Sequence, residues 1–196
     1  RAGENSRPWR RAAKSAKDKK RLQVATFNSS GWPQAKDFLE TVSSADIVYI
    51  QEHKLKGDLF LRAQEWASAR GWQPFMTEAL SSEGTAGKGG VGIFVRSHIE
   101  ATIPSGANSH VLVPGYCVFV HIHAGPRHGF LAGSLYLEQG HKLSGPNTSK
   151  ISTIGAYLAY YKIPYILGGD WNLTPNELSE SGFCERLRGR LVVPKQ

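Results

Sequence analysis

The chain has 196 residues, of which 40% are hydrophobic and 20% are charged, and its formal net charge is +8. This length suffices for one domain with a substantial core, and no apolar run approaches the roughly 20 residues of a membrane-spanning helix, so no membrane partner is expected. The two cysteines, Cys117 and Cys184, are too few for a disulfide-stapled secreted scaffold and favour a reducing, intracellular compartment.

The positive charge is concentrated near the N-terminus. Residues 1–21 hold nine Lys or Arg and two acidic residues, a net charge of +7, whereas the rest of the chain holds 15 basic and 14 acidic residues. A segment so rich in charge and so poor in apolar residues is expected to be a disordered tail or linker. It is compatible with contacts to nucleic-acid phosphates, with a nuclear localisation signal, or with a solvated linker from an upstream domain.

Strands and helices alternate after this tail. Residues 22–28 show the alternation of a strand, and residues 33–42 follow as a helix that opens at a proline. Residues 46–52 are apolar on both faces, which is typical of a buried strand. The first two strands therefore end in polar residues, Asn28 and Glu52.

A helix over residues 59–70 comes next, and a glycine-rich loop over residues 81–90 then leads into a strand over residues 91–96. The loop region contains the spacing Gly87-x-Gly89-x-x-Gly92, which is formally a dinucleotide-binding pattern. That function requires a helix N-terminus under the phosphates. Because a strand follows the glycines here, the pattern does not predict nucleotide binding.

Three antiparallel strands are expected in the middle of the chain, over residues 109–113, 116–123 and 129–136, separated by Pro-Gly and Gly-Pro turns. His121 and His123 share one face of the second strand. Paired imidazoles can bind zinc, but no thiol or carboxylate lies at a fixed spacing from them. They are interpreted as solvent-facing strand residues.

The last stretch combines a helix over residues 147–161, capped by Asn147-Thr148, with a strand over residues 163–170. The strand ends in two glycines and Asp170, Asn172 follows, and Thr174-Pro175 opens a further helix. A carboxylate and an amide at the mouth of a strand can orient a water or hold a phosphate oxygen. The same residues can instead form only an Asx turn between strand and helix.

Five motifs in this order resemble the endonuclease/exonuclease/phosphatase superfamily, and within it the apurinic-type endonuclease domain of non-LTR retrotransposons. The motifs are Val24-Ala-Thr-Phe-Asn28, Ile47-Val-Tyr-Ile-Gln-Glu52, Gly89-Gly-Val-Gly-Ile-Phe94, the strand up to Tyr136, and Gly169-Asp-Trp-Asn172. The resemblance covers about residues 22–180 and implies a four-layer α/β sandwich, in which two packed mixed β-sheets are flanked by helices. The active site is then expected at the strand ends, in a domain over residues 22–196.

The resemblance also implies roles for individual residues. Glu52 is expected to be the main Mg²⁺ ligand, assisted by Asn28, with Mn²⁺ as an alternative metal. Asp170 is expected to orient or deprotonate the attacking water, Asn172 to hydrogen-bond a phosphate oxygen, and Tyr136 to lie beside the scissile phosphate or leaving group. The chemistry is in-line displacement at phosphorus, in which positioning and charge neutralisation supply most of the catalysis.

The sequence departs from the family pattern in two places. Glu138 takes the place of a proline after Tyr136, where an acid is expected to repel phosphate, and Gln139 takes the place of an amide that can donate to the substrate. No histidine follows His141, so the family's terminal histidine has no counterpart, and its last strands are missing from the sequence. We therefore expect an incomplete second sheet with an open, partly apolar edge.

Three functions are compatible with these features. The first is a Mg²⁺-dependent DNA endonuclease domain that nicks target DNA for a downstream reverse transcriptase in the same polyprotein, in the nucleus. The second is a phosphoesterase of the same fold that acts on a phosphorylated lipid or small molecule. The third is a catalytically inactive fragment that binds nucleic acid.

Overall fold

The computed structural model describes residues 21–42, 44–81, 87–125 and 127–193. The basic tail predicted for residues 1–21 lies outside the described residues, except for Arg21. None of the helices in the described part of the chain has the length and apolar character that crossing a membrane requires.

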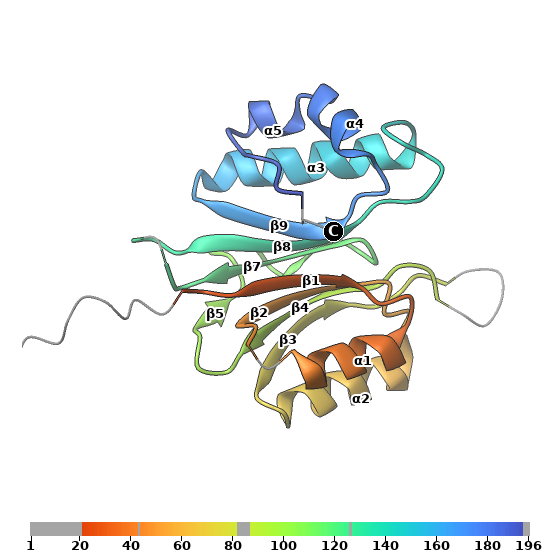
Figure 1. Cartoon of the computed structure of the whole chain (residues 1–196), viewed down its shortest axis with the longest axis vertical. Coiled ribbons are helices and arrows are strands. Elements are labelled where there is room, and N and C mark those ends of the chain that lie inside the picture. Colours follow the sequence, from red (N-terminus) through yellow and green to blue (C-terminus); the bar gives the residue numbers. More distant parts are fainter. Residues whose placement is uncertain (1–20, 43, 82–86, 126, 194–196) are drawn as a thin grey trace, which may run out of the picture.

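The first sheet has four strands in the order β1-β2-β4-β3, with β1 and β2 parallel and the other pairs antiparallel. Two helices, α1 and α2, cover its outer face (Figure 1). The bounds of these elements are β1 Val24–Asn28, α1 Trp32–Thr41, β2 Ile47–Gln51, α2 Gly57–Ser68, β3 Trp72–Thr77 and β4 Val91–Arg96.

The second sheet has the order β5-β7-β8-β9, with the short strand β6 paired to β7. Here β8 and β9 are parallel and the other pairs are antiparallel, and α3, α4 and α5 lie on the outer face (Figure 1). The bounds are β5 Ala101–Thr102, β6 Val111–Val113, β7 Cys117–Ile122, β8 Phe130–Tyr136, α3 Pro146–Tyr161, β9 Tyr165–Asp170, α4 Pro175–Glu180 and α5 Phe183–Arg186.

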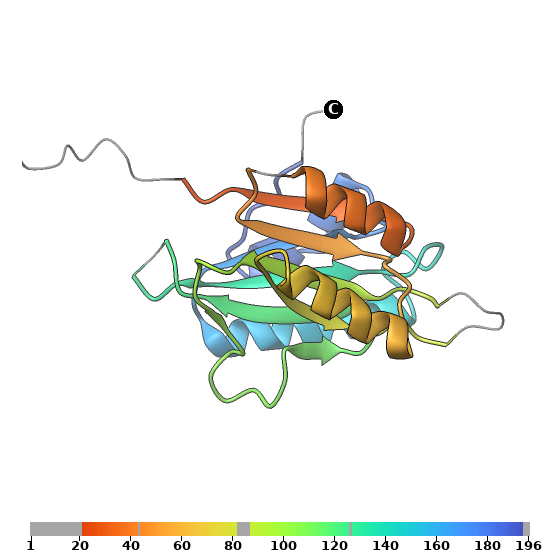
Figure 2. The same ribbon diagram turned by 90° about the horizontal axis from the view of Figure 1, so that it is seen from below.

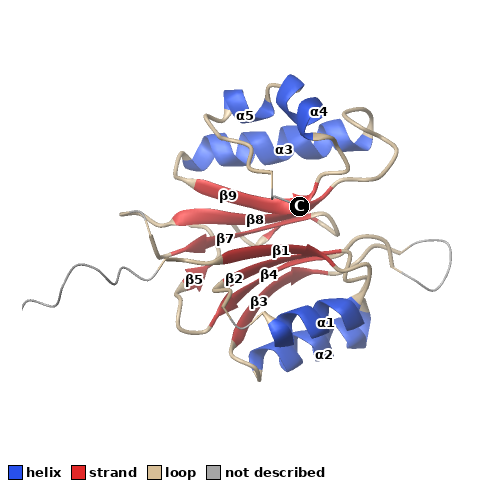
Figure 3. Ribbon diagram, viewed as in Figure 1, coloured by secondary structure: helices blue, strands red, loops and turns tan. Residues whose placement is uncertain are grey.

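The two sheets pack face to face, so the layers run helix, sheet, sheet, helix (Figures 2 and 3). Strand β2 shows why its sequence is apolar throughout. Ile47 and Tyr49 face the second sheet, whereas Val48 and Ile50 face α1 and α2, so alternate residues fill two different cores. The predicted α/β sandwich of two mixed sheets flanked by helices is confirmed.

Several local predictions were incomplete or wrong, and the short elements β5 and α5 were not predicted. Strand β3 was not predicted, because Pro74 interrupts its pattern; proline is tolerated there because β3 is an edge strand. Asn147 does not cap α3, which begins at Pro146 with Gly145 as the N-cap residue. The buried side chain of Asn147 instead donates to the carbonyl oxygen of Glu138 (2.8 Å) and accepts from the Glu138 amide (2.9 Å). Asn147 therefore fixes the chain after β8.

One side of the sandwich is open. Within the described residues, β1 pairs only with β2 and β9 pairs only with β8, so each sheet has an unpaired edge strand on this side. A cavity of about 1210 Å³ lies along these edges and is bounded by residues 186–192. Val24 and Ile166, one on each edge strand, are 37% and 41% exposed, as expected for a partly apolar open edge.

This open side predicts dye binding and self-association, because apolar side chains and unpaired strand edges are exposed together. We expect the protein to enhance the fluorescence of anilinonaphthalene sulfonate, and the double variant Val24→Thr/Ile166→Thr to enhance it less. Leu59→Ser/Leu61→Ser is the matched control, since these two side chains are exposed on α2 (63% and 54%). A monomer that melts cooperatively and binds no dye would contradict the prediction.

Candidate functional site

Four strands of both sheets deliver the predicted site residues to one end of the sandwich. The parallel register aligns Asn28 at the end of β1 with Gln51 at the end of β2, directly before Glu52. In the second sheet, Tyr136 at the end of β8 aligns with Asp170 at the end of β9. The carboxyl ends of parallel strands lie at the same end of a sheet. Because the two sheets pack face to face, these ends of both sheets lie next to each other.

The Asn28 side chain lies between the two predicted catalytic carboxylates. Its Nδ2 donates to Glu52 Oε1 (2.8 Å) and to Asp170 Oδ2 (2.6 Å), and its Oδ1 accepts from the Ser30 backbone amide (3.3 Å). The bond to Asp170 joins the first sheet to the second. One amide nitrogen thus brings together two carboxylates that are 118 residues apart in the sequence.

Backbone strain is concentrated around this group. Seven non-glycine residues in the described part of the chain have positive φ, and four of them belong to the turns at this end: Ser30, Glu52, Lys54 and Asn172, with φ of 53°, 56°, 58° and 46°. Such conformations persist only where the surroundings enforce them, and they gather at functional sites. The strain therefore marks these turns independently of their side-chain chemistry.

Asp170 and Asn172 form the turn that the sequence predicted after β9. Asp170 Oδ1 accepts from the Asn172 backbone amide (3.1 Å), and Asn172 Nδ2 donates to the carbonyl oxygen of Leu137 (2.6 Å). Both Asp170 oxygens are thus held in place. Gln139 is exposed in the turn after β8, and none of the hydrogen bonds among described residues joins it to Asn28, Glu52 or Asp170.

Tyr136 is almost fully buried and its ring stacks on Tyr116, with ring centroids 6.1 Å apart and an interplanar angle of 1°. Burial, followed by the nearby charges of Glu52 and Asp170, raises the pKa of Tyr136 to about 12. Its phenol is therefore protonated near neutral pH. A protonated phenol at this position can donate a hydrogen bond to an anion.

Glu138 does not present a free negative charge to the site. Its carboxylate binds Lys150 Nζ through Oε1 (2.8 Å) and Lys88 Nζ through Oε2. The hydrogen bonds from Lys150 and Lys88 lower the pKa of Glu138 to about 2. Because two cations surround one carboxylate, the expected repulsion of phosphate by Glu138 is offset in this structure.

The oxygen groups at this end have the chemistry of a magnesium site. Glu52 and Asp170 approach the same nitrogen of Asn28, an amide whose oxygen is also a suitable ligand. Mg²⁺ is commonly held by one or two carboxylates together with substrate phosphates and water. This pair of carboxylates with an amide is the candidate donor set; a group of three or more His, Cys, Asp or Glu suited to a metal does not occur among the described residues.

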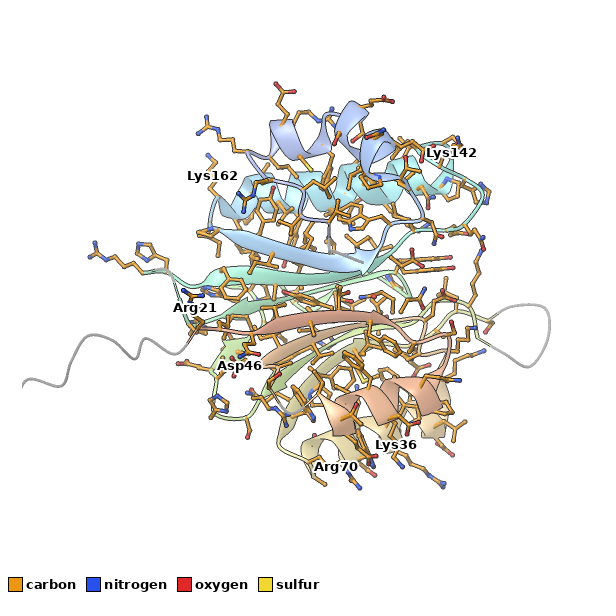
Figure 4. The ribbon with its side chains drawn as sticks, viewed as in Figure 1. Arg21, Lys36, Asp46, Arg70, Lys142 and Lys162 are labelled. Carbon is orange, nitrogen blue, oxygen red and sulfur yellow. The ribbon has the colours of Figure 1, made fainter. Side chains whose placement is uncertain are left out.

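The histidines of β7 lie elsewhere. The antiparallel register places Cys117 opposite Leu135, near Tyr136, and Ile122 opposite Phe130 at the other end of the sheet. His121 and His123 are therefore at the end remote from the site, where their rings lie 4.3 Å apart and His123 is exposed. Arg21 and Asp46 mark the same remote end (Figure 4).

The sequence did not identify Lys88, Lys150 and Tyr116 as site residues. Lys88 precedes β4, Lys150 belongs to α3 and Tyr116 precedes β7, so no short motif connects them. The one available signal was Glu138 itself, because an acid beside a tyrosine that is expected to bind phosphate calls for neutralising cations. Which lysines supply these cations depends on how elements distant in the sequence pack together.

Solved structures with a similar fold come from nucleases and phosphatases. The endonuclease domain of TRAS1, a telomere-specific non-LTR retrotransposon, has a TM-score of 0.56 at 16% identity, over 85% of this chain and 71% of that chain. The 3′ phosphatase NExo from Neisseria, bound to a product DNA hairpin, has a TM-score of 0.54 at 16% identity, over 86% and 70%. The human Nocturnin catalytic domain has a TM-score of 0.55 at 18% identity, over 83% and 68%.

The chain thus has the fold of the endonuclease/exonuclease/phosphatase proteins, as its motifs predicted. No protein-family model matches the sequence, and no curated protein matches it. With identities this low the comparisons establish the fold, and the chemistry must be argued from the residues.

The ion pairs of Glu138 predict a pH dependence of stability. Because the pKa of Glu138 falls from 4.5 to about 2 on folding, its stabilisation is present above pH 4.5 and is lost as the pH falls toward about 2. Glu138→Gln should therefore lower the free energy of unfolding near neutral pH, and its difference from the wild type should shrink across this window in urea titrations.

Glu177, whose pKa is also lowered to about 2 by Lys142, is present in both proteins and cancels in the comparison. Glu65→Gln, on the exposed side of α2, is the matched control and should follow the wild-type profile. Wild-type and Glu138→Gln curves that fall in parallel across the window would contradict the prediction.

Proposed function

We propose that this chain is a Mg²⁺-dependent phosphodiesterase domain that cleaves DNA, and that it acts as an endonuclease that nicks one strand. The observation that carries this proposal is that the amide nitrogen of Asn28 donates to the carboxylates of both Glu52 and Asp170. These two carboxylates come from different sheets. A structural role alone does not account for two carboxylates held together on strained turns at a sheet edge.

Glu52, with the amide oxygen of Asn28, would hold Mg²⁺, and Mn²⁺ fits the same donors. When bound, the metal supplies charge neutralisation at the phosphate and at the leaving oxygen. In the described structure the Asn28 amide group lies where its hydrogens neutralise part of the charge of the two carboxylates. Rotation of this amide would turn its oxygen toward a cation.

The remaining residues position the reacting groups. Asp170, with both oxygens fixed by Asn28 and by the Asn172 amide, is placed to orient the attacking water and accept its proton. The protonated phenol of Tyr136 would donate to a phosphate oxygen, and Asn172 and Gln139 would bind the phosphate from the following turns. No covalent intermediate with the chain is needed.

DNA is the proposed substrate on two grounds. Residues 1–21 carry a net charge of +7, which favours a polyanion, and two proteins of similar fold are described as a retrotransposon endonuclease domain and as a phosphatase bound to a DNA hairpin. We also propose a nuclear location and a reverse transcriptase in the same polyprotein, on the basis of the resemblance of the motifs to retrotransposon endonuclease domains.

Nicking of supercoiled plasmid tests the function. We expect Mg²⁺-dependent conversion to the open circle, abolished by EDTA, and a rate lower by about 10²- to 10⁴-fold in Asp170→Asn because proton transfer from water is lost. Glu52→Ala should also be inactive, and Glu65→Gln on α2 is the matched control with wild-type activity.

Failure of the wild type to nick plasmid would leave two alternatives that one further assay separates. Release of phosphate from a phosphorylated small molecule or lipid would favour a phosphoesterase of the same fold. DNA binding without turnover of either substrate would favour an inactive nucleic-acid-binding fragment.

Metal binding has its own prediction, which does not depend on turnover. A ligand that binds only the folded state raises the midpoint of thermal unfolding, so Mg²⁺ or Mn²⁺ should raise the wild-type midpoint in a concentration-dependent way. Glu52→Gln should abolish this shift because it removes the main anionic ligand, whereas Glu65→Gln should retain it. Equal shifts in all three proteins would place the metal elsewhere.

A further inference from the structure

Glu138 holds two lysines that differ in their surroundings. The Lys150 side chain is 9% exposed, and its ammonium also contacts the Pro146 carbonyl oxygen (3.3 Å) and lies 4.1 Å from the centre of the Tyr116 ring. The Lys88 side chain is 47% exposed, and Glu138 is its only partner among the interactions described. Lys150 is thus buried and held at several points, whereas the ammonium of Lys88 is half exposed and held by Glu138 alone among these interactions.

Departure of Lys88 would not expose a free charge on Glu138. Its Oε1 would keep Lys150. The carboxylate therefore has one permanent cation and one that is in excess. An excess cation beside an anion-binding site is available to neutralise a ligand.

The backbone fixes Lys88 at the border of the candidate site. Lys88 exchanges two backbone hydrogen bonds with Leu80 (2.9 and 3.0 Å), and the next residue, Gly89, accepts from the Lys54 amide (3.2 Å). A Cβ on Gly89 would lie 3.5 Å from the Tyr136 ring and 2.7 Å from the Gly115 carbonyl oxygen. Lys88 is therefore anchored next to Tyr136 while its ammonium remains half exposed.

We propose that Lys88 binds a phosphate of the nucleic-acid substrate, and that Glu138 holds its ammonium in place of that phosphate while the site is free. Binding exchanges a carboxylate for a phosphate on the same ammonium, with no change in the protonation of either group. This inference rests on the proposed function, because it adds a phosphate contact to the same site. It gives the acid at position 138 a role beyond filling the position of a proline.

A purely structural ion pair makes a different prediction from a substrate-exchanged one. If the Lys88–Glu138 pair only stabilises the segment before β4, then loss of either partner should disorder this segment and weaken DNA binding in the same way. If Glu138 competes with phosphate for Lys88, then removal of Glu138 should strengthen binding while removal of Lys88 weakens it. The two single variants therefore move in opposite directions under the proposal, and the gain of Glu138→Gln depends on Lys88, which separates exchange from a general effect of charge.

The test is fluorescence anisotropy of a labelled DNA duplex with the full chain in EDTA, which prevents cleavage, over a series of salt concentrations. We expect Lys88→Gln to weaken binding by on the order of tenfold and to reduce the slope of log K against log salt by about one. Glu138→Gln should tighten binding, and Lys88→Gln/Glu138→Gln should lose that gain. Lys88→Arg keeps the charge and should restore binding and slope.

Lys36→Gln, on the outer face of α1 (Figure 4), is the matched control for loss of one positive charge and should leave the affinity near the wild-type value. The inference is overturned if Lys88→Gln keeps the wild-type affinity and slope, or if Glu138→Gln weakens binding as Lys88→Gln does. Wild-type protein that binds no DNA would overturn the proposed function as well, so the two failures are distinguishable. Thermal melts confirm that each variant is folded. If Lys88→Gln does not fold, the affinity and salt slope of Lys88→Arg decide the outcome.

Discussion

The hydrogen bonds from Asn28 to Glu52 and Asp170 depend on how the two sheets of the sandwich pack against each other. Asn28 and Glu52 end neighbouring strands of the first sheet, whereas Asp170 ends an edge strand of the second. Two carboxylates facing each other repel, and the repulsion grows as water is excluded. The amide of Asn28 offsets part of it in the free protein. A divalent cation would be attracted by both carboxylates and would relieve this repulsion.

A balance of charges extends from this pair to the phenol of Tyr136. The carboxylates of Glu52 and Asp170 contribute to raising its pKa, so they keep it a hydrogen-bond donor. Glu138 would add a third negative charge, but Lys150 and Lys88 neutralise it. The site thus combines the acids Glu52 and Asp170 with the two cations that hold Glu138, and under the proposed function the acids would face the metal and the cations the phosphate. Such a division is what a reaction at a phosphodiester requires.

Local sequence pattern predicted the strand ends, whereas the four layers were implied by the resemblance of the motifs to a known family. Alternation, buried apolar runs and turn residues gave most elements, and the order of motifs placed Asn28, Glu52, Tyr136 and Asp170 together. Strand β3 escaped notice because an edge strand tolerates Pro74. The cation cluster of Glu138 was beyond reach for a different reason: Lys88 and Lys150 approach it from elements 50 and 12 residues away, and only tertiary packing selects them.

Strand β9 connects the candidate site to the open side of the molecule. It carries Asp170 at one end, yet only β8 pairs with it among the described strands. Close packing on both faces compensates, because a Cβ on Gly168 would lie 2.2 Å from the Tyr49 ring of the first sheet and one on Gly169 would lie 2.5 Å from the Leu135 carbonyl oxygen of β8. The two glycines let β9 pack closely against its neighbours. The position of Asp170 therefore rests on close packing at these glycines rather than on a second neighbouring strand.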